Sequence, residues 1–235
     1  GEEIMTDETK DGITASECIE SNMGTYADYT IETKFPSVYD GLKKIARRIL
    51  CVLHTLAVKE GKSLPKELTV LGKVVEMHPH GDQSIAQAIS TLAQPFSHIA
   101  PLVFSDCNIG NYVGDSPAAA RYVDVAESDI AKSLFFQDIN TDMFNMIPCE
   151  SELGVEPEYL IPRIPTTLLV QSFAIAIGYK TETFSMCVAD LCKMTKEFIK
   201  IRSSTPDWMM KVKHLSRYTL PDFATYCVLR NSKDL

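Results

Sequence analysis

The sequence predicts an α+β fold, with a winged-helix domain followed by a partial α/β domain. Apolar residues recur at helical spacing over residues 42–56. Two further helical patterns, at 66–75 and 83–92, flank a short turn that contains proline and glycine, which is the layout of a helix-turn-helix. Short apolar runs bounded by turn residues follow and predict strands.

The N-terminal residues 1–28 are polar and show little periodicity, which predicts a leader or linker. The segment YTIETKF at 29–35 alternates and is rich in β-branched residues, so we expect a strand or an extended arm there. We place the first domain at 29–136 and a second, truncated one at 137–235.

The predicted helix at 42–56 has an apolar side and a basic side. Arg47 follows Lys43 by four residues, and Arg48 follows Lys44 by four, so these cations fall on one helical face. We expect an exposed basic ridge that is suited to phosphate groups. A solvated face without a ligand is the alternative.

The turn HPHGD at 78–82 brings His78 and His80 close to the start of a helix. Free backbone N–H groups at a helix start favour phosphate binding. The two imidazoles could also hold a metal ion, but no third ligand is spaced to join them, so we predict no metal site.

Beyond Pro95 the pattern predicts short elements. We expect the strands of a wing at 101–104 and 110–113, and a helix at 127–136. An extended segment at 155–165, a core strand at 168–179 and a last helix at 187–201 should follow.

Composition restricts the class of protein. The chain has 235 residues and a formal net charge of −8, but residues 31–82 hold nine basic and six acidic side chains, which is compatible with one local phosphate-docking surface. Seven scattered cysteines without a Cys-x-x-Cys pair predict reduced thiols in an intracellular protein. No apolar run approaches the roughly 18 residues of a membrane span.

Residues 110–130 contain the strongest candidate for chemistry. Tyr122 directly follows Arg121, after a run of small residues. A phenol has a pKa of about 10 and needs help to act as a nucleophile, while a guanidinium can hold phosphate oxygens. In a regular strand the two side chains would point to opposite faces. A joint role therefore requires an irregular backbone, or a site shared between two copies; the alternative is an ordinary strand with a packed tyrosine.

Four blocks carry a resemblance to a known family. They are FPSVYDGLKKIARRIL (35–50), HPHGDQSIAQAISTLAQPF (78–96), GDSPAAARY (114–122) and VEPEYLIPRIPTTLLVQSFAIAIG (155–178). In this order they resemble the DNA breakage-reunion core of type IIA topoisomerases: the A subunits of gyrase and topoisomerase IV, and eukaryotic and large-DNA-virus topoisomerase II. The segment HPHGD looks bacterial, whereas QSIAQAI, AAARY and VEPEYLIP look eukaryotic or viral. We therefore expect a viral or divergent eukaryotic source, in the host cytoplasm or the nucleus.

The resemblance implies roles for single residues. Tyr122 would attack a DNA phosphate and form a transient 5′-phosphotyrosyl link, so that a second duplex can pass. Arg121 and His80 would assist it as catalytic residues. The implied DNA contacts are Lys43, Arg47, Arg48, His78 and, as an apolar wedge between base pairs, Ile175. A buried core position is the alternative for Ile175.

The resemblance also implies partners and cofactors. It implies an enzyme, an ATP-hydrolysing type IIA topoisomerase that acts on double-stranded DNA as a homodimer, whose second domain is the family's tower. Mg²⁺ and ATP would bind to domains outside this chain, because its sequence has no Asp-x-Asp pair, no Glu-Gly-x-Ser-Ala block and no glycine-rich nucleotide loop. No membrane association is expected.

Some positions depart from the family pattern. Lys44 and Ala46 stand where members usually have proline and a polar residue, and Gln-Ser-Phe-Ala at 171–174 replaces a glycine-rich turn before the wedge. Two other classes remain open. One is a winged-helix DNA-binding module without catalysis. The other is a tyrosine recombinase or type I enzyme, which would need several dispersed cations around its tyrosine.

Overall fold

The chain folds as helices and small two-stranded sheets, in agreement with the predicted α+β class. The computed structural model describes residues 12–61, 64–137, 139, 141–152, 154–169, 172–183 and 185–204, with the short strands at 220–221 and 228–229. Most of the predicted end of the second domain therefore lies outside the described residues.

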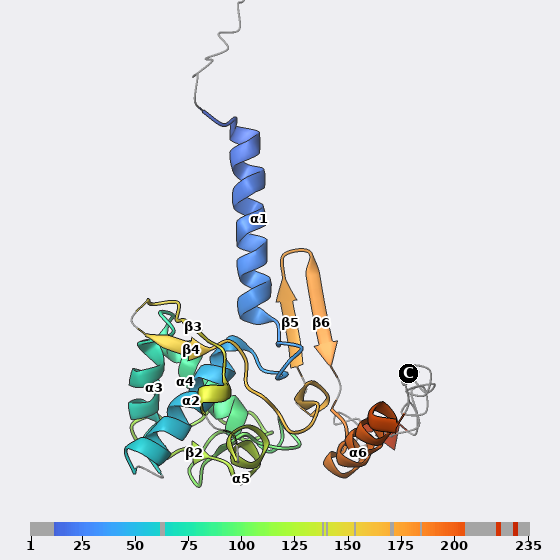
Figure 1. Cartoon of the computed structure of the whole chain (residues 1–235). Helices are drawn as coiled ribbons and strands as arrows, with labels where there is room; N and C mark the ends of the chain where they lie inside the picture. The colour runs from blue at the N-terminus through green and yellow to red at the C-terminus, as the bar shows by residue number, and fades with distance from the viewer. Residues whose placement is uncertain are drawn as a thin grey trace, which may run out of the picture.

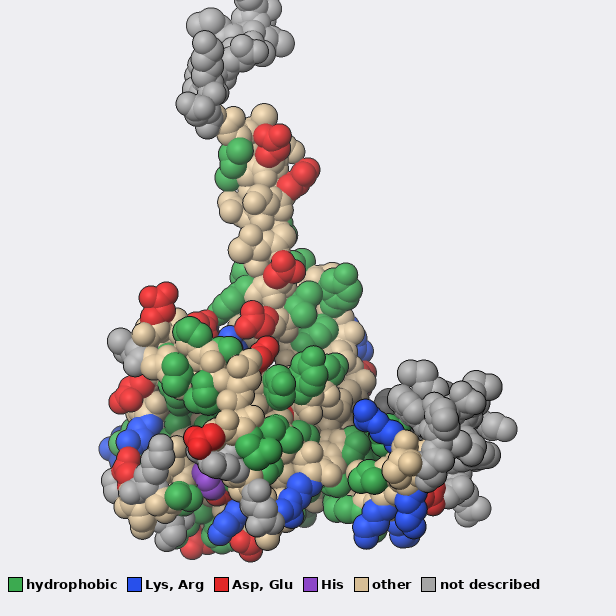
Figure 2. All heavy atoms as spheres, in the orientation of Figure 1, with side chains coloured by type: hydrophobic (Ala, Val, Ile, Leu, Met, Phe, Trp, Pro, Cys, Tyr) green, Lys and Arg blue, Asp and Glu red, His purple; other side chains and the backbone are tan. Residues whose placement is uncertain are grey.

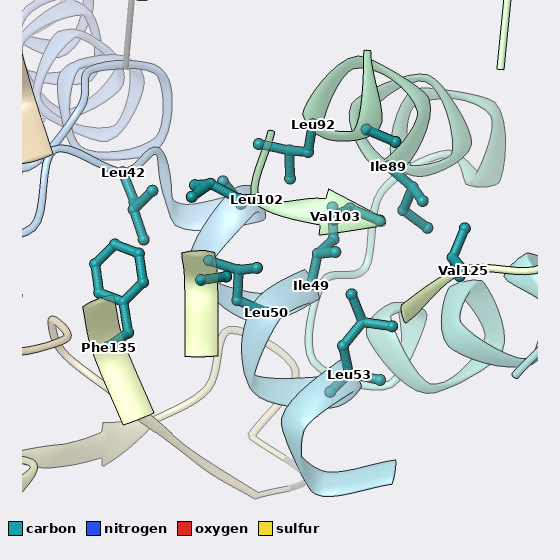
Figure 3. Packing of buried hydrophobic residues seen from close by; sticks show 14 of the residues in the cluster. Leu42, Ile49, Leu50, Leu53, Ile89, Leu92, Leu102, Val103, Val125 and Phe135 are labelled. Carbon is teal, nitrogen blue, oxygen red and sulfur yellow. The ribbon is translucent and has the colours of Figure 1, made fainter. Parts of the chain in front are cut away.

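Three helices form the centre of the molecule: α2 (Lys44–Lys59), α3 (Glu67–Val75) and α4 (Asp82–Ala93) (Figure 1). All three were predicted from apolar spacing and are confirmed, with ends that shift by at most three residues. Figure 3 shows side chains of α2 and α4 converging, with Leu102 from the loop before β1 and Phe135 from η1 closing the cluster. Val70 and Val74 of α3 belong to the same cluster. Its fully buried aliphatic members from the helices are Ile49, Leu50, Leu53, Leu56, Val70, Val74, Ile85 and Ile89. Each such side chain stabilises the fold by about 1.5–3 kcal/mol through burial.

The short strands β1 (Val103–Phe104) and β2 (Ala126–Glu127) pair antiparallel. The prediction for 101–104 is confirmed, whereas that for 110–113 is wrong. The side-chain oxygen of Asn111 accepts hydrogen bonds from the backbone N–H groups of the residues at 113, 114 and 115, which folds the segment into a turn. The partner of β1 comes instead from beyond Tyr122, so the segment 105–125 is a long excursion between paired strands.

A helical segment follows β2. It consists of α5 (Asp129–Ala131) and the π-helical turn η1 (Lys132–Phe136), and it confirms the helix predicted for 127–136 apart from its first two residues. Ser128 caps it by accepting a hydrogen bond from the N–H of Ala131 at 3.0 Å.

The second half of the chain is built from hairpins and one long helix. In order these are η2 (Thr141–Met143), β3 (Met146–Pro148), β4 (Val155–Pro157), η3 (Thr166–Leu168), β5 (Ser172–Ala176), β6 (Tyr179–Thr183), α6 (Val188–Ser204), β7 (Leu220–Pro221) and β8 (Val228–Leu229). β3 pairs with β4, β5 with β6 and β7 with β8, all antiparallel. The last predicted helix is confirmed as α6, and the predicted core strand is the half-exposed β5.

The N-terminal helix α1 (Ala15–Lys34) projects away from the three-helix centre (Figure 1). The predicted strand at 29–35 is therefore wrong, and the predicted domain boundary at 28 falls inside a helix. Thr14 and Glu17 form a capping box: the Thr14 hydroxyl accepts from the Glu17 N–H at 3.2 Å, and the Glu17 carboxylate accepts from the Thr14 N–H at 2.8 Å. Periodicity missed this helix because it has almost no buried face; Thr30 is its one buried residue.

A glycine corner sets the start of α2. Gly41 has a φ of 67°, and a Cβ on it would lie 2.7 Å from the carbonyl carbon of Thr166. The Thr166 hydroxyl donates to the Asp40 carbonyl at 2.5 Å, while the Asp40 carboxylate accepts from the N–H groups of Leu42 and Leu160, each at 2.9 Å. The corner thus ties α2 to a segment more than a hundred residues later.

Charge is distributed unevenly over the surface. Figure 2 shows Lys and Arg side chains gathered over α6, whereas the projecting α1 displays acidic ones. The exposed cations of α6 are Lys193, Lys196, Lys200 and Arg202. None of the helices in the described ranges has the length and apolarity needed to cross a bilayer.

Candidate functional site

Tyr122 lies on the surface next to Arg121, in a turn and not in a strand. Its N–H donates to the Ala119 carbonyl at 2.8 Å, so the backbone is irregular here, as a joint role of the two side chains requires. The Tyr122 side chain is 68% exposed, and the guanidinium carbon of Arg121 lies 5.7 Å from the centre of its ring. Phenol and guanidinium are therefore presented together to solvent.

The residues after Tyr122 anchor this turn to the start of α3. Val123 and Val125 are buried, the Val123 carbonyl accepts from the N–H of Glu67 at 2.9 Å, and the Val125 N–H donates to the Pro65 carbonyl at 3.0 Å. Lys66 closes the contact through an ion pair with the next acidic side chain of the loop, Asp124, at 2.6 Å. These contacts hold the backbone next to the exposed Tyr122 in place.

The predicted exposed basic ridge on α2 is wrong for two of its four members. Arg47 is buried against Asp40, with N–O distances of 2.6 and 3.1 Å. The Arg48 side chain is 1% exposed and binds Glu156 through two bonds, of 2.5 and 2.8 Å. Sequence spacing identified the helical face correctly, but it could not show the carboxylates that come from loops outside the helix.

The other two members of the ridge are partly exposed. Lys43 donates to the carbonyl of Phe173 at 2.9 Å, and burial lowers the pKa of its ammonium group from the usual value. Lys44 pairs with Glu32 of α1 at 2.9 Å. Cationic surface on this side of α2 is therefore supplied by the two lysines.

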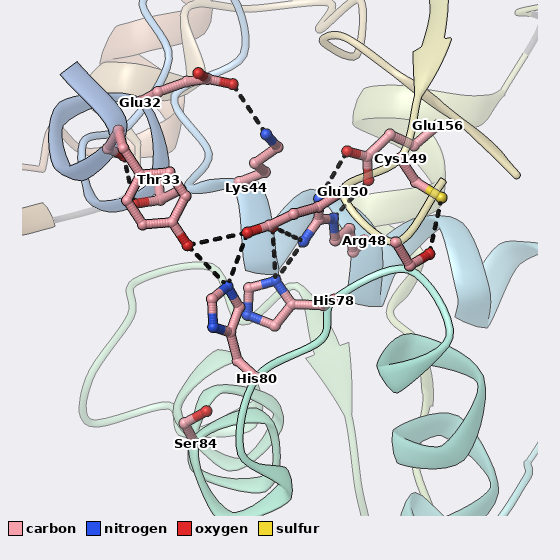
Figure 4. A network of polar contacts seen from close by, with 12 residues as sticks. Glu32, Thr33, Lys44, Arg48, His78, His80, Ser84, Cys149, Glu150 and Glu156 are labelled. Atoms are coloured by element: carbon pink, nitrogen blue, oxygen red, sulfur yellow. Dashed lines mark hydrogen bonds and ion pairs between the residues drawn. The ribbon is translucent and has the colours of Figure 1, made fainter. Parts of the chain in front are cut away.

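The two histidines of the HPHGD turn meet a carboxylate that the sequence did not suggest. Glu150, in the turn between β3 and β4, lies 3.2 Å from His80 Nε2 and accepts a bond from the Tyr29 hydroxyl at 2.9 Å (Figure 4). Tyr29, on α1, also lies 3.2 Å from His80 Nε2. The His78 and His80 rings are 4.3 Å apart between centres. Since seventy residues separate His80 from Glu150, no local spacing could have predicted the contact.

Arg48 links this group to the protein interior. Its guanidinium donates to Glu150 at 3.1 Å and also contacts His78 Nδ1. Burial, followed by the charge of Arg48, lowers the pKa of His78 to about 4. Burial would raise the pKa of Glu150, but the hydrogen bonds from Tyr29 and Arg48 outweigh it, so its pKa lies below the usual value. At neutral pH the site therefore holds a carboxylate and a neutral His78.

These groups also have the composition of a metal site. One ligand atom each from His78, His80 and Glu150 lies within 4.8 Å of the others, so Glu150 is the third ligand that the sequence did not reveal. However, the Arg48 guanidinium already binds Glu150 and faces His78, and its positive charge opposes a second cation there. The arrangement fits a hydrogen-bond network better than a metal centre, and we keep the assignment of no metal ligand.

Ile175 lies on the hairpin of β5 and β6, beside α1 (Figure 1). It is 58% exposed, so its interpretation as a buried core residue is wrong. Phe173, two residues earlier on the same face of β5, is also exposed, and Lys180 lies across from Ile175 with its ammonium 5.2 Å from the Phe173 ring. The hairpin therefore presents an apolar edge to solvent.

Comparison with known proteins identifies the family. The family model that describes the A subunit of DNA gyrase/topoisomerase IV matches residues 34–234. The chain belongs to this family. The resemblance of the four sequence blocks to a type IIA breakage-reunion core is thereby confirmed.

Individual relatives agree with the family model. The A subunit of DNA gyrase from Borrelia hermsii is 31% identical over 238 residues, which cover 99% of this chain and 28% of the relative. The A subunit of DNA topoisomerase 4 from Staphylococcus aureus is 32% identical over 190 residues, which cover 80% of this chain and 24% of the relative. The protein of the same name from Staphylococcus epidermidis is 31% identical over 216 residues, which cover 91% of this chain and 26% of the relative. This member of the gyrase/topoisomerase IV family thus spans about a quarter of the length of the curated relatives it matches.

Proposed function

We propose that this chain is the DNA-binding and cleavage-religation part of a type II DNA topoisomerase, with Tyr122 as its nucleophile. The observation that carries the proposal is the exposed Tyr122 hydroxyl beside Arg121, on a turn whose following residues are buried and hydrogen-bonded to α3. The family membership supplies the chemical context.

The proposed reaction is a reversible transesterification. The Tyr122 oxygen forms a bond to a DNA phosphorus, the bond from phosphorus to the 3′ oxygen breaks, and the phenolic proton is passed on while the 3′ oxygen gains one. The phosphotyrosyl link keeps the energy of the phosphodiester, so resealing needs no nucleotide in the chemical step. Arg121 would bind the phosphate oxygens and stabilise the charge that develops on them. His80 would hydrogen-bond the reacting strand.

Metal and nucleotide chemistry would come from outside this chain. Mg²⁺, when bound by a domain of the same enzyme or of a partner protein, would neutralise the phosphoryl charge. ATP would likewise bind elsewhere, which agrees with a chain that spans about a quarter of its relatives. Because one tyrosine cuts one strand, a double-strand break requires two copies, most simply a twofold homodimer.

Several features support a winged-helix surface for the duplex. α3, the HPHGD turn and α4 follow one another as helix, turn and helix, and would act as a helix-turn-helix with the paired β1 and β2 as its wing. Lys43 would contact the phosphate backbone and Ile175 would act as the wedge, because both are accessible. We assign no phosphate contact to Arg47 or Arg48, since carboxylates already neutralise both. The second half of the chain would be the start of the tower.

The decisive experiment is to trap the covalent intermediate. The protein is combined with the polypeptide that supplies the metal-binding and ATPase domains, Mg²⁺ and plasmid, and protein attached to DNA is measured after denaturation. Tyr122→Phe should abolish the adduct and leave salt-sensitive DNA binding in place. Tyr112→Phe is a matched control, because Tyr112 is 85% exposed in the same excursion.

The same experiment tests the rival class. An adduct that persists in Tyr122→Phe would remove this residue from the mechanism. DNA binding with no adduct in the unsubstituted protein would favour a winged-helix module without catalysis.

A further inference from the structure

We propose that Glu150 and Tyr29 are positioning residues that hold the His80 ring for the DNA reaction. The inference rests on the proposed function for its consequence in catalysis, but the positioning itself is a property of the free protein. It joins three segments that are distant in sequence: α1, the turn before α4 and the turn between β3 and β4.

The first step concerns how firmly Glu150 is held. Its carboxylate accepts from Arg48, whose guanidinium is fixed by two bonds to the buried Glu156. The Glu150 side chain is 20% exposed, so it is screened from bulk water on most sides. A carboxylate that is fixed by a buried guanidinium can orient a neighbouring imidazole, as the partner of a functional histidine often does.

The second step concerns which ring nitrogen carries the proton. An ionised carboxylate can only accept a hydrogen bond, and the Tyr29 hydroxyl already donates its hydrogen to Glu150 at 2.9 Å. Both oxygens lie 3.2 Å from His80 Nε2. Two acceptors therefore face one nitrogen, which selects the tautomer with hydrogen on Nε2.

The third step concerns the other nitrogen. Nδ1 of His80 has no hydrogen-bond partner among the residues that the structure describes, and the side chain is 37% exposed. The ring is fixed through Nε2, so Nδ1 is presented away from Glu150 with its lone pair. There it can accept a hydrogen bond, or donate one to a phosphate oxygen once protonated. Without the two oxygens, rotation of the ring or a change of tautomer would remove this group from the substrate side.

The contribution of Tyr29 comes from α1. This helix has little buried surface of its own. The Tyr29 hydroxyl links it by a hydrogen bond to His80, in the turn before α4. Burial and the contact with Glu150 raise the pKa of Tyr29, so its hydroxyl stays protonated and remains a donor at neutral pH. The docking of α1 is thus coupled to the orientation of His80.

The test has a spectroscopic arm and a kinetic arm. Nitrogen-15 NMR of the free protein should show His80 as the Nε2–H tautomer. Glu150→Gln should mix the tautomers, because an amide can donate as well as accept. In the assembled enzyme, Glu150→Gln and Tyr29→Phe should each lower the DNA cleavage rate by about 10- to 100-fold, with DNA affinity unchanged.

Matched controls come from the same helix. Tyr26→Phe and Glu20→Gln make the same chemical changes on α1, at exposed residues outside the His80 contact, and should leave tautomer and rate unchanged. An Nδ1–H tautomer in the unsubstituted protein would overturn the proposal, as would variants at both positions that cleave like these controls. If Glu150→Gln fails to fold, the unsubstituted tautomer and Tyr29→Phe decide the matter.

The two proposals can fail separately. If the unsubstituted enzyme forms no adduct that depends on Tyr122, the proposed function fails, and with it the effect of Glu150 and Tyr29 on catalysis. The tautomer of His80 would still support or overturn the positioning.

Discussion

Arg48 contacts two carboxylates and an imidazole, and its side chain is almost fully buried. Removing one partner of such a buried pair costs about 3–5 kcal/mol, because the other charge is left without compensation. Sequence reasoning placed Arg48 correctly on the face opposite the apolar stripe, but it predicted solvent there. Residue type and spacing could suggest the exposed Tyr122 and Arg121, whereas they could not reveal carboxylates that lie 102 and 108 residues away.

The burial of His78 has a consequence that depends on pH. Its pKa of about 4 lies below the usual value of 6.5, so between these values the unfolded chain binds a proton that the native protein does not. The free energy of unfolding should therefore fall as pH is lowered from 6.5 to 4, by about 2–3 kcal/mol in total. NMR titration of the His78 ring should give a midpoint near 4, and His78→Asn should flatten this part of the stability curve. A ring midpoint above 6 would contradict the burial argument.

Elements with a strong apolar stripe could be predicted, and those without one could not. α2, α3 and α4 each bury one face, so their spacing revealed them. The helix α1 was missed because its stability comes from its cap and its own backbone rather than from an apolar stripe. The pairing of β1 with β2 could not be predicted either, because two-residue strands carry no periodicity and their register depends on an intervening excursion of about twenty residues.

The first residue of α3 yields a test at the scale of one helix. Glu67 is 2% exposed, and burial raises its pKa to about 7. The native carboxyl group therefore keeps its proton over a range in which the unfolded chain, with a pKa near 4.5, has lost it. The free energy of unfolding should fall as pH rises from 4.5 to 7.

Replacing the carboxyl group of Glu67 should remove this fall in the free energy of unfolding. Glu67→Gln should be more stable than the unsubstituted protein at pH 8, by about 2–3 kcal/mol before any loss of favourable charge at the helix start. Urea unfolding at pH 5 and pH 8 measures the difference. Glu76→Gln, at the exposed other end of α3, is the control: it keeps Glu67, so its free energy of unfolding should fall between pH 5 and pH 8 as that of the unsubstituted protein does. If Glu67→Gln differs from the unsubstituted protein by the same free energy of unfolding at both values of pH, Glu67 ionises freely in the folded protein.

Across the whole molecule, charge is divided between two helices outside the three-helix centre: the acidic α1 projects above it and the basic α6 lies to one side of it (Figures 1 and 2). The net charge of −8 would repel DNA if it were spread evenly. Binding should therefore depend on local cations, and its affinity should fall steeply with salt and vary little with base sequence.

Lys43 tests this expectation for one cation. If it neutralises one phosphate, Lys43→Gln should reduce the slope of log affinity against log salt by about one. Lys73→Gln removes a lysine that pairs with Glu60 and should leave the slope unchanged. Fluorescence anisotropy with a labelled duplex at several salt concentrations gives both slopes. Equal slopes for the two variants would place the Lys43 ammonium away from the DNA.

The corner at Gly41 restricts how this protein can diverge. Any other residue there would have to adopt a left-handed backbone and, at the same time, overlap the main chain at Thr166. Relief would require the two chain segments to separate, and that would break the bond from the Thr166 hydroxyl to Asp40. Every substitution of Gly41 should therefore destabilise the fold, whereas substitutions at neighbouring surface positions can be harmless. We expect related proteins to vary around this position and to keep glycine at it.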